Sequence, residues 1–114
     1  MIKLRCATAL TAWLLTAPAI TLGACPYPED VDIPDGSAAT EQEMLAAQKQ
    51  VKAYIADMEA YLKCLDEEEA ALGEEVTPEQ RALHVSRHNA AVDAMEQVAA
   101  QFNEQIRAYK SVND

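Results

Sequence analysis

Basic residues are scarce in this chain of 114 residues, which has nine Lys and Arg against 19 Asp and Glu. Two of the nine, Lys3 and Arg5, lie in the first 24 residues, which contain no acidic side chain. Residues 25–114 therefore carry seven basic and 19 acidic side chains, a net charge of −12. Nucleic acids and anionic lipid surfaces attract basic proteins. The composition argues against both as partners.

Catalytic motifs are absent as well. The sequence has no HExxH pair, no phosphate-binding glycine-rich loop and no GxSxG nucleophile elbow. Carboxylates are plentiful, but nothing in their spacing selects an acid–base pair. We therefore expect a protein that is not an enzyme and that binds no organic cofactor.

A long apolar run occurs only at the start of the chain. A positive segment, MIKLR, is followed by apolar residues from Cys6 to Leu22 and then by Gly23 and Ala24. This order is typical of a secretory signal peptide. Several threonines and a proline make the run a poor membrane anchor, which needs about twenty strongly apolar residues. We predict that residues 1–24 are a signal peptide and that residues 25–114 are exported, to the periplasm or beyond, with no membrane span.

Two processing signals overlap at the end of this run. Leu22-Gly23-Ala24-Cys25 resembles the bacterial lipobox, in which the cysteine becomes the lipidated first residue of a membrane-anchored lipoprotein. Ala17-Pro18-Ala19 instead offers the small residues that ordinary signal peptidase prefers. Cys25 is thus either a lipid attachment site or free to form a disulfide.

Prolines set residues 25–37 apart from the remainder. Pro26, Pro28 and Pro34 block helix formation and favour an extended, polyproline-like backbone. Asp35-Gly36 marks a turn. We predict an extended arm over residues 25–37.

Two long helices should follow. Residues 38–72 and 79–112 contain neither glycine nor proline. Thr40-Glu41-Gln42-Glu43 and Thr77-Pro78-Glu79-Gln80 are capping-box patterns, and Gly73 suits a helix end. These signals predict helices over about 40–72 and 78–112.

Both segments show a seven-residue apolar repeat that is typical of coiled-coil packing. In the first the repeat and its neighbours are Met44, Val51, Met58, Leu65 and Leu72, with Ala47, Tyr54, Ile55, Tyr61 and Leu62. In the second they are His88, Met95, Phe102 and Tyr109, with Val85, Ala91, Val92, Val98 and Ile106. We interpret the Met and aromatic side chains as core, and predict an all-α fold in which residues 38–114 form an antiparallel helical hairpin.

The arm and the first helix have matching lengths. Twelve extended steps from Cys25 to Ser37 cover about 37 Å at ~3.1 Å per residue. Cys64 lies 24 residues beyond Thr40, about 36 Å at ~1.5 Å per residue. An arm packed along the first helix would bring Cys25 to Cys64, and a thin two-helix core needs such a link. We favour a Cys25–Cys64 disulfide, contributing about 3–4 kcal/mol, over lipidation of Cys25.

Several short segments resemble a group of small exported proteobacterial proteins of uncharacterised function. They are Cys25-Pro26, Ile33-Pro34-Asp35-Gly36, Glu43-Met44, Val51-Lys52-Ala53-Tyr54, Tyr61-Leu62-Lys63-Cys64-Leu65, His88-Asn89-Ala90-Ala91-Val92-Asp93-Ala94-Met95-Glu96 and Phe102-Asn103-Glu104-Gln105. The resemblance implies export, two cysteines and a helical fold. It implies no activity.

His84 and His88 are the candidates for a metal site. Their spacing of four places both imidazoles on one helix face, as in many metal sites. The hairpin would bring them near Cys64 and Cys25, but oxidised cysteines cannot act as thiolate ligands. The alternative is structural: His84 pairs with the acidic residues at 66–69, and His88 bonds Tyr61.

The sequence thus predicts an exported cell-envelope protein that acts as a structural or interaction module. It would bind a protein partner or itself through a helix face on which alanines permit close approach: Ala46, Ala56, Ala60, Ala90, Ala94 and Ala100. The alternatives are a periplasmic metal-binding protein that uses His84 and His88, and a lipoprotein anchored through Cys25.

Overall fold

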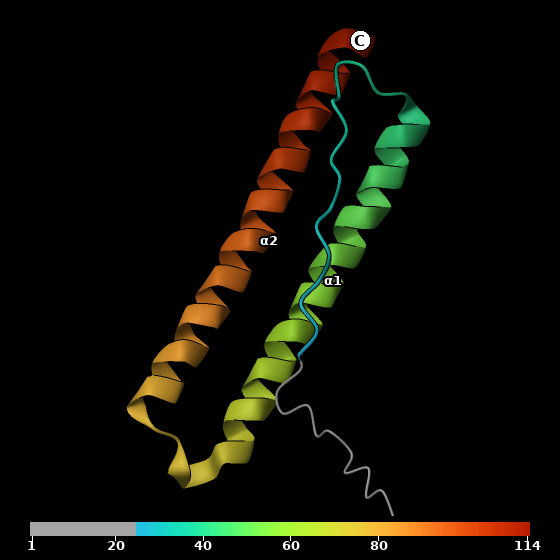
Figure 1. The fold of residues 1–114 in the computed structure, drawn as a ribbon. Coiled ribbons are helices and arrows are strands. Elements are labelled where there is room, and N and C mark those ends of the chain that lie inside the picture. Colours follow the sequence, from blue (N-terminus) through green and yellow to red (C-terminus); the bar gives the residue numbers. More distant parts are fainter. Residues whose placement is uncertain (1–24) are drawn as a thin grey trace, which may run out of the picture.

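The structure is a computed structural model that describes residues 25–114. The predicted signal peptide, residues 1–24, lies outside the described residues. The elements are α1 (Glu41–Leu72), a short 3-10 turn η1 (Gly73–Glu75) and α2 (Pro78–Asn113). Figure 1 shows α1 and α2 antiparallel to each other and joined through η1. No strand occurs in residues 25–114, and the predicted all-α hairpin is confirmed.

Both helices begin at the capping boxes that the sequence predicted. Thr40 Oγ1 accepts the Glu43 N–H at 3.1 Å, and Glu43 Oε2 accepts the Thr40 N–H at 2.7 Å. Thr77 and Gln80 make the same reciprocal pair at 3.1 and 2.9 Å. Each box satisfies two backbone donors that a helix start leaves without partners. The observed boundaries agree with the predicted ones to within about a residue.

Residues 25–37 form the predicted extended arm, which Figure 1 shows running along the helix pair to its open end, where α1 begins. Cys25 and Cys64 are joined by a disulfide, with their Cα atoms 5.7 Å apart. Val31 and Ile33 pack against the buried residues between the helices. The arm therefore serves as a third layer over the hairpin.

The core consists of two small clusters of buried side chains. The first contains Met44, Ala47, Val51 and Phe102, and the second contains Tyr54, Met58 and Ala91. Val31 of the arm contacts both clusters. Ile55 of α1 and Val98 of α2 also pack against both clusters, so the arm and the two helices together make the core continuous.

Burial falls away beyond Leu65, toward η1. The predicted core positions Leu72 and Val85 are 40% and 50% exposed, whereas Leu65 is only 3% exposed. The described part of the arm begins at Cys25, which is bridged to Cys64, so no described residue of the arm covers the helices beyond that point. Within residues 25–114, α1, η1 and α2 alone surround this part of the seam.

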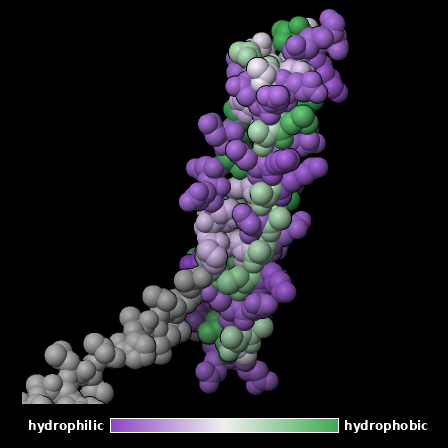
Figure 2. All heavy atoms as spheres, turned by 90° about the vertical axis from the view of Figure 1, so that its right-hand side faces the viewer, coloured by the Kyte–Doolittle hydropathy of each residue, from purple (hydrophilic) through white to green (hydrophobic). Residues whose placement is uncertain are grey.

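Hydrophilic side chains dominate the outer side of α1, which faces the viewer in Figure 2. In the part of the chain that the structure describes, no helix combines the length and apolar character needed to cross a membrane.

Candidate functional site

The disulfide marks the place where the arm ends and the open part of the hairpin begins. Tyr27 of the arm packs edge-on against Tyr61 of α1, with ring centroids 5.1 Å apart. Glu68, one turn beyond Cys64, has a carboxylate oxygen within 4.8 Å of both sulfur atoms. Within residues 25–114, Cys25, Cys64 and Glu68 are the only compact group of metal-ligating atoms. The two cysteine sulfurs are bonded to each other. The site as it stands offers no thiolate.

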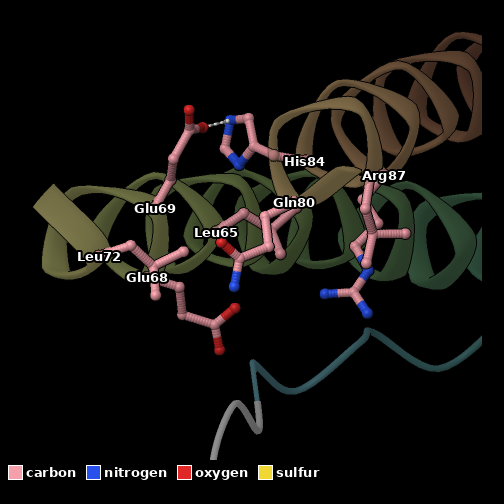
Figure 3. A pocket seen from close by; sticks show the side chains of 8 residues that line it. Leu65, Glu68, Glu69, Leu72, Gln80, His84 and Arg87 are labelled. Atoms are coloured by element: carbon pink, nitrogen blue, oxygen red, sulfur yellow. Dashed lines mark ion pairs between the residues drawn. The ribbon is translucent and has the colours of Figure 1, made fainter. Parts of the chain in front are cut away.

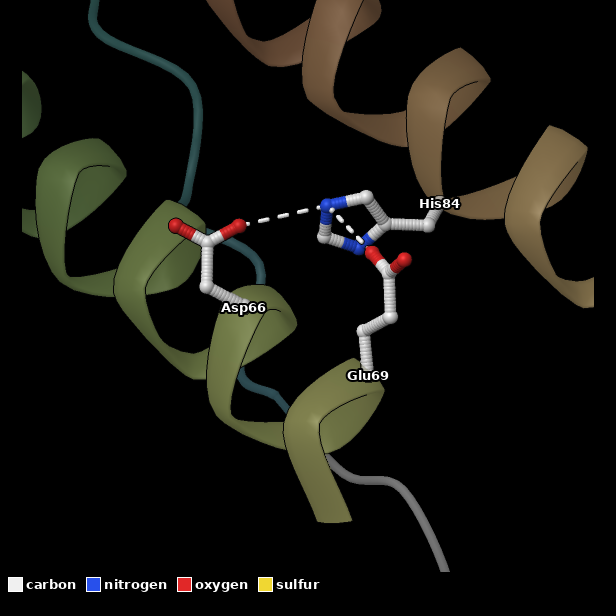
Figure 4. Close-up of polar contacts among 3 residues, drawn as sticks. All are labelled: Asp66, Glu69 and His84. Carbon is white, nitrogen blue, oxygen red and sulfur yellow. Dashed lines mark ion pairs between the residues drawn. The ribbon is translucent and has the colours of Figure 1, made fainter. Parts of the chain in front are cut away.

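His84 lies between two carboxylates of α1 (Figure 4). Its Nε2 is 3.2 Å from Asp66 Oδ1 and 2.9 Å from Glu69 Oε2. The imidazole is 17% exposed, so these contacts lie at the edge of the helix pair and not in open solvent. The last turn of α1 contains no basic residue of its own. The predicted pairing of His84 with the acidic run is confirmed.

His88 lies one turn further along α2 and is half-buried. Its ring centroid is 6.3 Å from that of His84, and the two planes are tilted by 40°. None of the side-chain hydrogen bonds found within residues 25–114 joins His88 to Tyr61. The described residues do not gather His84, His88 and the cysteines into one compact ligand set. Metal binding through the two histidines stays a prediction.

An open groove, which we call the distal groove, lies between the helices beyond the disulfide (Figure 3). It has a volume of about 120 Å³. Its lining residues are Leu65, Glu68, Glu69, Leu72, Gln80, Leu83, His84 and Arg87. Pockets that hold small-molecule substrates usually measure about 300–1,000 Å³. The distal groove is therefore suited to a single side chain and not to a whole substrate molecule.

Apolar side chains form the floor of the distal groove, and charged ones form its rim. Leu65 is buried, whereas Leu72 and Leu83 are 40% and 50% exposed. Figure 3 shows the side chains of Glu68 and Arg87 directed toward the side where the arm lies. The distal groove thus continues the line that the arm follows between the helices.

Two further groups have perturbed ionisation. Burial raises the pKa of the Tyr54 phenol, and the nearby Tyr27 and Asp30 add to the effect. The Ser37 hydroxyl and backbone N–H lower the pKa of Asp35, because both donate to its carboxylate, at 2.6 and 3.0 Å. Tyr54 belongs to the core and Asp35 to an exposed turn.

The comparisons with protein-family models, with curated proteins and with solved structures each find no match to this chain. The resemblance to small exported proteobacterial proteins therefore stays a prediction.

The sequence indicated the disulfide and the pairing of His84, but it did not indicate the distal groove. Leu72 was assigned to the core because it falls on the seven-residue repeat. Leu83 does not fall on that repeat and was not singled out at all. The available signal was the length of the predicted arm over residues 25–37, which matches α1 only as far as Cys64.

Proposed function

We propose that this protein is a non-enzymatic, exported module of the cell envelope that acts by binding a protein partner. The observation that carries the proposal is the arm clamped to α1 by the Cys25–Cys64 disulfide. A disulfide persists in oxidising compartments and is rare in the cytosol, and it uses the Cys25 thiol that lipidation would require. The signal-peptide pattern of residues 1–24 supports export, and the net negative charge of residues 25–114 argues against nucleic acid and anionic lipid as partners.

The shape supports binding and not catalysis. The pockets found within residues 25–114 are open hollows on a narrow helix pair. Catalysis generally needs reactive groups that converge in a site shielded from water. The long helix faces, by contrast, offer an extended surface that another protein can contact.

Photo-crosslinking in the cells that naturally produce the protein tests this function. A photoreactive amino acid is placed at exposed positions along both helices, Leu45, Ala56, Leu83 and Ala100. We expect a discrete heavier species, in the exported fraction, from some positions and not from others. A protein that stays in the cytosol, or that forms no adduct from any position, would contradict the proposal. An adduct with the mass of a dimer would indicate self-association through a helix face.

A further inference from the structure

We infer that the distal groove binds an extended, cationic segment of a partner protein, one that inserts an apolar side chain between Leu72 and Leu83. This inference rests on the proposed function, because it assigns the site and the chemistry of the partner. Three observations carry it: the geometry of the groove, its exposed leucines and the charge around it.

The geometry comes from the arm. Residues 25–37 lie extended over the helix pair, and Val31 and Ile33 turn alternate side chains into the core. Past the disulfide the same two helices border the distal groove, whose lining includes Leu65, Leu72 and Leu83. The same walls therefore suit a second extended segment, and the volume of about 120 Å³ suits one apolar side chain.

The exposed leucines show that this part of the molecule is incompletely covered. Leu72 and Leu83 are 40% and 50% exposed and line one groove from opposite helices. Covering apolar surface contributes roughly 25 cal/mol per Å². A single inserted side chain therefore gives only a modest affinity. Specific binding of a partner segment needs a second source of attraction.

The charge supplies that attraction and selects the partner. Residues 65–87 contain seven acidic side chains and two arginines, a net charge of −5. Among the ion pairs found within residues 25–114, only Asp66 and Glu69 are engaged, both with His84. Glu68 shares its side of the groove with Arg87 and has no ion pair among those found within residues 25–114, so it can attract a lysine or arginine of the partner while the surrounding acids outweigh Arg87. The same charge repels a second copy of this chain, whose distal groove carries the same acids.

Fluorescence anisotropy on the oxidised protein tests the inference. The probe is a labelled eight-residue peptide of alternating lysine and leucine, and the matched controls replace its lysines by glutamate or its leucines by serine. We expect saturable binding of the lysine–leucine peptide only. Binding should weaken as NaCl is raised from 0.1 to 1 M, because the screening length falls from about 10 Å to about 3 Å.

Variants locate the site. Leu72→Ser with Leu83→Ser should weaken binding at least tenfold, whereas Leu45→Ser, at a position 53% exposed near the other end of α1, should leave it unchanged. Glu68→Lys should weaken binding, and Glu59→Lys, on an exposed part of α1, should weaken it much less. Circular dichroism of each variant shows whether the hairpin is intact. The comparison of Glu68→Lys with Glu59→Lys tests the site without altering its leucines.

Several outcomes would overturn the inference. One is equal binding of the glutamate–leucine peptide, and another is binding that the Leu72 and Leu83 changes leave intact. A third is a groove already filled by a second copy, seen as a dimer in sedimentation. Crosslinks in cells from Leu45, Ala56 or Ala100 but not from Leu83, together with no peptide binding, would reject the distal groove as the site. The proposed function would then still stand.

Discussion

The backbone of Gly36 lies directly against the backbone of Gln105, across a sequence separation of 69 residues. The Gly36 N–H donates to Gln105 Oε1 at 2.9 Å. A Cβ at Gly36 would lie 2.8 Å from the carbonyl carbon of Gln105 and would overlap its carbonyl oxygen. Glycine is therefore required here by the close approach of the turn to α2. The disulfide fixes one end of the arm to α1, and this contact fixes the other end to α2.

Replacing Gly36 tests that second attachment. Gly36→Ala should lower the free energy of unfolding by about 2 kcal/mol, as overpacking of a close contact does. Urea unfolding of the oxidised protein measures the change. Ser37→Ala, in the next and exposed residue, is the control and should change the free energy by less than about 0.5 kcal/mol. A Gly36→Ala protein of unchanged stability would show that the turn is not held against α2.

Removing the disulfide tests the first attachment. Cys25→Ser with Cys64→Ser should lower the free energy of unfolding by about 3–4 kcal/mol, because the bridge closes a loop with a sequence separation of 39. The double change avoids a lone thiol that could link two chains. Urea unfolding of the variant and of the oxidised parent gives the difference. An equal free energy of unfolding for the variant and the oxidised parent would mean that the disulfide does not stabilise the fold.

The buried tyrosine predicts how stability responds to alkali. The pKa of Tyr54 is raised in the folded protein, so the unfolded chain loses its phenolic proton first, at about pH 10. Stability from this group is complete below that pH and is lost as pH rises toward the folded pKa. Tyr54→Phe should therefore reduce the loss of stability above about pH 10. Urea unfolding at pH 8, 10 and 11 measures it, with Tyr109→Phe as the control.

Zinc titration decides the role of the histidines. We expect no stoichiometric uptake by the oxidised protein, because the described residues do not gather His84 and His88 into a compact ligand set and the cysteine sulfurs are joined. Isothermal calorimetry provides the measurement. Uptake of one zinc per chain that His84→Ala with His88→Ala abolishes would establish the metal-binding alternative.

Most of the fold followed from local signals in the sequence. The capping boxes at Thr40 and Thr77 fixed where the helices begin, and the seven-residue repeat identified Met44, Val51 and Met58 as core. The link between Cys25 and Cys64 followed from matching the lengths of two segments. Such signals need only the rise per residue and the residues on one helix face.

The remaining features depend on contacts between distant segments. Asp35-Gly36 indicated a turn, but nothing near it in the sequence indicated that Gly36 would meet Gln105. The repeat placed Leu72 and Val85 in the core, yet both are exposed. A repeat shows which face of a helix is apolar, whereas burial also depends on what covers that face. Within the described residues, the covering arm extends only from Cys25, which is bridged to Cys64, toward the open end of the hairpin.

The intact mass of the protein recovered from the cell envelope, with alkylation before and after reduction, tests the central claim most directly. The claim is that the exported chain is clamped by a Cys25–Cys64 disulfide and carries no lipid. We predict a chain that has lost its signal peptide, resists alkylation when oxidised and takes up two labels once reduced. A chain with a large mass gain at its N-terminus, partitioning into detergent and one alkylatable thiol without reduction, would contradict the account.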